Sequence, residues 1–184
     1  PTRLSLSQSM ESDEIRKKRS LSEEVRKNPN DGGAKIRLAI ATISAGDYNI
    51  ETLAQKGIKQ GGDKKDGYLA LTIASTVNGH YDKAANYAET ASSETGNAAV
   101  LFDEYATILE SLADSSGEKT GLKINSKGGD GLAAAFDEFM NGLIAEKNGD
   151  FESATKSFAK SFQKGLKGDK IESKIIDNFK KTND

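Results

Sequence analysis

The amino-acid sequence predicts an all-α fold in which short pairs of helices stack as repeats. The first observation is a phrase of glycine, a polar residue and an aromatic ring, which starts at Gly46, Gly79 and Gly149. These glycines are separated by 33 and 70 residues, and the longer interval is about twice the length of one helix-pair repeat. The second observation is that apolar residues recur at helical spacing on both sides of each phrase. Such a period is typical of stacked helix-turn-helix repeats.

Composition limits what the protein can do. The chain has 184 residues, which suits one domain or one short solenoid, and its formal net charge of −2 gives no general attraction to nucleic acid. Hydrophobic residues make up only 35%, so we expect a thin, layered core. The absence of Cys excludes disulfides, thiolate metal sites and thiol catalysis. No apolar run approaches the roughly 18 residues of a transmembrane helix, so membrane insertion is not expected.

Residues 1–30 are predicted to form a flexible N-terminal arm with one short helix. Residues 1–12 are polar and Ser-rich without periodicity, which indicates a flexible lead-in. The short helix is expected over residues 13–27. Ser20 and Glu23 have the spacing of a capping box, which favours a break within that helix.

The repeat domain is expected to occupy residues 31–168. Pro29 ends the preceding helix and Asp31 can cap the first helix of the first repeat. Gly46 and Gly79 separate the two helices of the first and second repeats, because the residue just past a helix often needs a positive φ.

The third unit departs from this plan. Residues 97–113 form an amphipathic helix, but the expected partner helix is missing. Residues 115–131 instead contain five Gly and three Lys, a composition that disfavours helix. We predict a long loop there, with a short extended piece at residues 122–124. A loop of this length is either functional or disordered.

The fourth unit resumes the pattern, with a helix over residues 132–147, a turn at Gly149 and a second helix through Phe162. Residues 169–184 are predicted to be a capping helix and tail. Its apolar residues follow one stripe, which suits a helix that covers the open end of a stack.

The chain resembles the tetratricopeptide repeats, a family of 34-residue helix pairs. The best local match is Asn28-Pro29-Asn30-Asp31, then Leu38-Ala39, then Gly46-Asp47-Tyr48. The resemblance covers residues 31–96 and 131–168, and residues 97–130 only by their first helix. The repeats are degenerate: no Trp occupies the usual first-helix position, and Asn141 stands where the family has Leu.

The resemblance implies a short right-handed solenoid of antiparallel helix pairs whose first helices line a concave face. Such a face binds an extended or helical peptide. The residues expected to line this partner-binding groove are Ile36, Ile40, Ile43, Leu69, Ile73, Val77, Phe136, Phe139 and Leu143. The alternative is that the helix at 13–27 or the long loop lies in the groove and covers it.

Charged residues offer weaker candidates. Asp103, Glu110 and Asp114 share one helix face, which could receive a basic partner or weakly bind a divalent cation, although a solvated acidic face is the simpler interpretation. His80 is the only His and stands in a turn, so it is interpreted as a surface residue rather than a catalytic one. The basic run at residues 16–19 is interpreted as a solvated segment, with phosphate, acidic protein or headgroup contact as the alternative.

These observations predict a non-enzymatic scaffold that binds a protein or peptide, with no catalytic residue, cofactor, metal or nucleic-acid partner. The alternative is a structural component that self-associates through the edges of its repeats. The sequence begins with Pro1, so we expect that a Met or a longer segment has been removed. Together with the absence of Cys, this slightly favours the bacterial cell envelope over the cytoplasm.

Overall fold

The computed structural model describes residues 2–124, 129 and 131–183, and their side chains from Asp13 onward. The described residues form an all-helical structure with nine α-helices, one 3-10 helix and no strand. The elements are α1 (Thr2–Lys27), α2 (Gly32–Ser44), α3 (Glu51–Lys59), α4 (Lys64–Val77), α5 (Tyr81–Glu94), η1 (Gly96–Ala98), α6 (Ala99–Ala113), α7 (Gly131–Lys147), α8 (Phe151–Gln163) and α9 (Asp169–Thr182).

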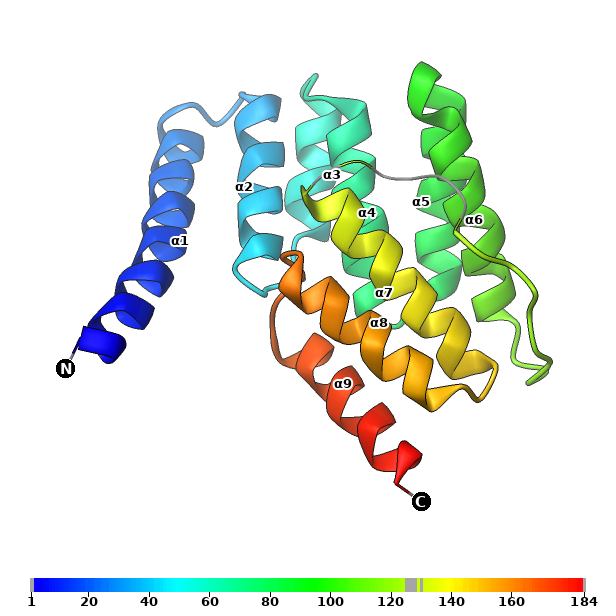
Figure 1. Cartoon of the computed structure of the whole chain (residues 1–184). Helices are drawn as coiled ribbons and strands as arrows, with labels where there is room; N and C mark the ends of the chain where they lie inside the picture. The colour runs from blue at the N-terminus through cyan, green and yellow to red at the C-terminus, as the bar shows by residue number, and fades with distance from the viewer. Residues whose placement is uncertain (1, 125–128, 130, 184) are drawn as a thin grey trace.

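Each α-helix packs against the next one in the chain (Figure 1). Helices α1 to α6 follow one another across the molecule, whereas α7, α8 and α9 form a second group, in which α7 lies in front of α4 and α5 and α9 lies lowest in this view. The expected boundaries at residues 31 and 169 coincide with the N-cap of α2 and the first residue of α9.

The three glycine phrases make the same turn. Gly46, Gly79 and Gly149 have φ of 88°, 81° and 78°, the left-handed region that only glycine adopts without strain. In each turn, the residue after the glycine donates its backbone N–H to the carbonyl five residues earlier, which closes the end of the preceding helix. The turns predicted from the phrase are therefore confirmed, and Asp150 caps α8 by accepting from the N–H of Ser153.

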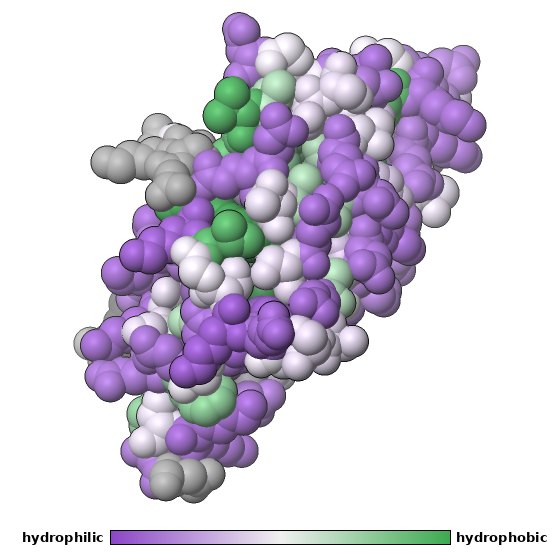
Figure 2. Space-filling model, turned by 90° about the vertical axis from the view of Figure 1, so that its right-hand side faces the viewer, coloured by the Kyte–Doolittle hydropathy of each residue, from purple (hydrophilic) through white to green (hydrophobic). Residues whose placement is uncertain are grey.

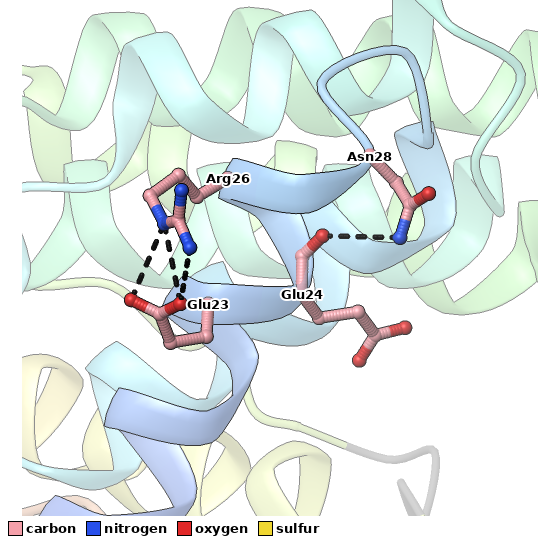
Figure 3. Close-up of polar contacts among 4 residues, drawn as sticks. All are labelled: Glu23, Glu24, Arg26 and Asn28. Atoms are coloured by element: carbon pink, nitrogen blue, oxygen red, sulfur yellow. Dashed lines mark hydrogen bonds and ion pairs between the residues drawn. The ribbon is translucent and has the colours of Figure 1, made fainter.

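The N-terminal arm differs from the prediction. Residues 2–27 form one continuous helix of 26 residues, so the prediction of a short helix at 13–27 with a break near Ser20 is wrong. Pairs of opposite charge three residues apart, Arg16 with Asp13 and Arg26 with Glu23, support this polar helix along its length. Figure 3 shows its end, where the Asn28 side chain donates to the carbonyl of Glu24.

One hydrophobic core runs through the helices from α2 to α9. Its largest side chains come from α6, α7 and α8, where the rings of Tyr105 and Phe136 meet edge to face at 4.9 Å between centroids. Elsewhere the core is built mainly from Ala, Ile and Leu. The thin, small-residue core expected from composition is thus combined with one aromatic cluster.

Helices α6 and α7 run in the same direction, and this explains the missing helix of the third unit. The Tyr105 hydroxyl donates to Asp137 at 2.7 Å, and further along both helices the Lys147 ammonium donates to the carbonyl of Asp114 at 3.0 Å. Because the contacts follow the same order in both helices, the connection between them must return along the length of α6. A short turn cannot make this return.

The predicted loop at 115–131 corresponds to this return segment. Its described residues carry no helix or strand, so the extended piece at 122–124 is not part of a sheet. Residues 125–128 and 130 lie outside the described residues. The side chain of Asn148 fixes the segment, because it accepts from the N–H of Thr120 and donates to the carbonyl of the same residue.

Candidate binding surfaces

The predicted partner-binding groove is not an open surface. Seven of its nine residues are buried in the core, and only two remain partly exposed. The buried ones are Ile36, Ile43, Ile73, Val77, Phe136, Phe139 and Leu143. A partner could not contact these side chains without separating the helices, so the prediction of a continuous apolar groove is wrong.

The physical reason is that neighbouring helices cover these side chains. Ile36 lies beside Gly57 and Gly67, and the ring of Phe139 packs against that of Phe158 at 5.2 Å between centroids. Residues of α2, α4, α6 and α7 together line a pocket of about 290 Å³, in which Ile40 and Leu69 face Leu101 and Leu132. The strip is therefore part of the core and not an open row. Helix α1 packs against α2, and Leu122 and Ile124 of the long loop pack against the core.

The structure offers a second surface, between α3, α4 and α5, which we call the tyrosine cleft. It has a volume of about 460 Å³, within the usual range for ligand sites. It is lined by Thr52, Gln55, Lys56, Ile58, Lys59, Tyr68, Leu71 and Tyr87. The four polar residues from α3 follow the spacing i, i+3, i+4, i+7, which places them on one face of that helix.

Hydrogen bonds hold the two tyrosine rings of the cleft in place. The Tyr87 hydroxyl donates to Glu51 and accepts from the side-chain amide of Gln55 at 2.7 Å. The Tyr68 hydroxyl donates to Glu94 at 2.6 Å. Burial, followed by these bonds to carboxylates, raises the pKa of Tyr68 and of Tyr87 to about 12. Both hydroxyls therefore stay neutral at physiological pH.

Two cations stand on the α3 side of the cleft. The side chains of Lys56 and Lys59 are exposed, and no ion pair or hydrogen bond engages either ammonium group among the described residues. The nearby Glu51 is already occupied by Tyr87 and by an ion pair with Lys83 at 3.3 Å. The cleft thus combines an apolar floor at Leu71, two fixed aromatic rings and two available positive charges.

The predicted acidic face exists as a solvated surface. Asp103, Glu110 and Asp114 are all exposed. A hydrogen bond with Glu89 of α5 is the main cause that raises the pKa of Glu110, whereas hydrogen bonds from Ser116 lower that of Asp114. Figure 2 shows the side of the molecule nearest α5 and α6, where the surface is mainly hydrophilic and its apolar patches are small and separate.

The other residues singled out from the sequence do not form a further binding site. His80 is exposed at the start of α5, as predicted, and its side chain makes no capping hydrogen bond. Part of the basic run is paired, Arg16 with Asp13 at 3.0 Å and Lys18 with Asp47 at 3.9 Å. Among the residues that the structure describes, no three His, Asp or Glu side chains gather closely enough to hold a metal ion. Within the same residues, no helix has the length and apolar content to cross a membrane.

No family model, curated protein or solved structure matches this chain. Family membership is therefore not established, and the likeness to tetratricopeptide repeats remains a resemblance in sequence pattern.

Sequence reasoning missed the tyrosine cleft. Tyr68 and Tyr87 are 19 positions apart in the sequence, and no local pattern joins them. The available signal was the polar stripe on α3, which includes Lys56 and Lys59. Packing between helices does not require two Lys on one helix face, so this stripe indicated a possible binding surface. Locating the cleft also required knowing that α3 and α5 both flank α4.

Proposed function

We propose that this protein is a non-enzymatic scaffold that binds a segment of another protein in the tyrosine cleft. The helices would form a short right-handed solenoid of antiparallel pairs, as the tetratricopeptide resemblance implies. The observation that carries the proposal is the combination in one cleft of two free ammonium groups and two rings held by carboxylates. The binding surface would then lie between α3 and α5 rather than in the groove predicted from the sequence.

The chemistry of the cleft suits an acidic segment that carries one apolar side chain. An apolar side chain can enter between Tyr68 and Tyr87 above Leu71, where it gains contact with aromatic faces. Carboxylates beside it can pair with Lys56 and Lys59, which have no partner of their own within the described chain. Fixed aromatic rings favour binding because little side-chain entropy is lost on complex formation.

The same features argue for binding rather than catalysis. A general acid or base works best when its pKa lies near the operating pH. The pKa of each of the two tyrosines is about 12, far above neutral pH. The two lysines are exposed to water, where an ammonium group is a charge for recognition rather than an activated nucleophile.

Site-specific photo-cross-linking tests this proposal. A benzophenone amino acid replaces Thr52 in the cleft, and in a matched control it replaces Lys160 on the exposed face of α8. We expect discrete cross-linked proteins from position 52 in cells and none from position 160. Equal capture at both positions, or none at position 52, would overturn the proposal.

A second pair of variants tests the role of charge. Lys56→Glu with Lys59→Glu should abolish the capture at position 52, because the acidic segment would meet carboxylates instead of ammonium groups. Lys160→Glu with Lys17→Glu changes the net charge equally at exposed sites on α8 and α1 and should leave capture unchanged.

The alternative function, a component that self-associates, is favoured by a separate observation. Ile176 and Phe179 on α9 are more than half exposed, whereas Ile171 on the same helix is fully buried. Charges placed at Ile171 would disrupt the core, so a test of self-association belongs at Ile176 and Phe179.

A further inference from the structure

Helix α9 carries apolar side chains on two faces. Its inner face, with Ile171 and Ile175, packs against the core. Its outer face exposes 51% of Ile176 and 57% of Phe179, which lie three residues apart and therefore side by side. Only four large hydrophobic side chains of the described residues are exposed, and these two are the only ones that share a helix face.

The charges beside this outer face are arranged symmetrically. Glu172 precedes Ile176 by four residues, and Lys180 follows it by four. Both are exposed, and neither makes an ion pair or side-chain hydrogen bond among the residues described. By contrast, Lys174 on the inner side is paired with Glu146 at 2.7 Å. The outer face of α9 thus has an apolar centre with one negative end and one positive end.

We propose that this face binds the same face of a second copy of the chain, with the two α9 helices antiparallel and crossing at Ile176. In that arrangement Glu172 of each copy lies at the same height as Lys180 of the other copy. Each of these residues is about 6 Å along the helix axis from Ile176, since an α-helix rises about 1.5 Å per residue. A two-fold axis through the crossing makes both ion pairs at once, and two-fold dimers are the commonest oligomers.

The size of the face determines the expected strength. Helix α9 has 14 residues and is about 21 Å long, so a contact between two such helices falls below the area of a standard stable interface. The dimer should therefore be weak and depend on protein concentration. This association is independent of the tyrosine cleft, so either proposal can fail while the other stands.

Sedimentation velocity of the full chain, from micromolar to about millimolar concentration, tests the proposal. The unmodified protein should shift from monomer to dimer within this range. Ile176→Asp with Phe179→Asp should remain monomeric, whereas the exposed control Val100→Asp on α6 should dimerise normally. A monomer throughout, higher oligomers, or a dimer that survives the double substitution would overturn it, as would loss of the dimer in Val100→Asp.

A charge exchange tests the antiparallel geometry. Glu172→Lys alone and Lys180→Glu alone each place like charges opposite one another and should weaken the dimer about tenfold. The double exchange restores both ion pairs and should recover the original affinity. A mixture of the two single variants should form a mixed dimer, because each supplies the charge that the other needs. Failure of both rescues would exclude this pairing.

Discussion

The hydroxyl of Tyr48 donates a hydrogen bond to the backbone carbonyl of Lys167, which is 119 residues further along the chain. The same region brings Gly46 against Gly168, where a Cβ on Gly168 would lie 2.5 Å from the carbonyl oxygen of Gly46. Asn78 at the end of α4 joins them, since its amide donates to the carbonyl of Tyr48. The linker between α8 and α9 therefore packs against the turn between α2 and α3, and these contacts join the last two helices to α2 and α3.

Tyr48→Phe should lower the free energy of unfolding by about 1–2 kcal/mol, because it leaves the carbonyl of Lys167 without this donor in a largely buried setting. Urea unfolding measures the change. The control is Tyr81→Phe, since Tyr81 is also partly buried but its hydroxyl makes no hydrogen bond with a described residue. Equal losses in the two variants would show that the bond to Lys167 contributes nothing specific.

Gly142→Ala should destabilise the protein. Its new methyl group would lie 2.6 Å from the ring of Phe158, which is fully buried and cannot move aside easily. Overpacking outweighs the better helix propensity of Ala, so we expect a net loss of about 1–2 kcal/mol. Thermal and urea unfolding measure it. Gly121→Ala, where nothing lies within 4 Å, should change stability by less than about 0.5 kcal/mol. An unchanged Gly142→Ala would mean that α7 and α8 pack less closely than described.

Asn148→Ala should loosen the segment that returns from α6 to α7. Both hydrogen bonds between Asn148 and the backbone of Thr120 would be lost. The segment contains Lys119 and Lys123, which are exposed, so limited trypsin digestion should cut there several times faster. Digestion at exposed Lys160 serves as the internal reference. Equal acceleration at both places would indicate global destabilisation instead of local release.

The tyrosines should ionise only at high pH. Burial and bonds to carboxylates raise the pKa of Tyr68 and Tyr87 to about 12, above the value of about 10 in an unfolded chain. A raised pKa in the folded state contributes stability that is complete below pH 10 and is lost as the pH rises towards 12. Thermal midpoints should therefore fall across this interval, and ultraviolet absorbance should show phenolate forming late. Phenolate formation near pH 10 without unfolding would contradict the described hydrogen bonds.

Features that depend only on neighbouring residues in the sequence were predictable. The turns at Gly46, Gly79 and Gly149 and the cap at Asp31 were predictable, because backbone φ and nearby N–H groups determine them. The length of α1 was not, since it depends on many weak charge pairs in a sequence with few apolar residues.

Features that join distant segments were also missed. The burial of Phe136 and Phe139 follows from the way α7 packs beside α6 and α8, which no local pattern specifies. The tyrosine cleft needs three helices to be placed before Lys56 and Tyr87 can be recognised as neighbours. The all-helical class and the absence of a helix after residues 97–113 were predicted, whereas the tyrosine cleft required the structure.

The central claim is that partners bind in the tyrosine cleft. Hydrogen–deuterium exchange of the full chain, with and without the segment recovered by cross-linking at position 52, tests it most directly. Binding in the cleft predicts slower exchange in α3 and α5, with α7 and α9 unchanged. Slower exchange confined to α7 and the start of α4, beside the pocket that contains Ile40 and Leu69, would contradict the claim. It would indicate instead that partners bind at the groove predicted from the sequence.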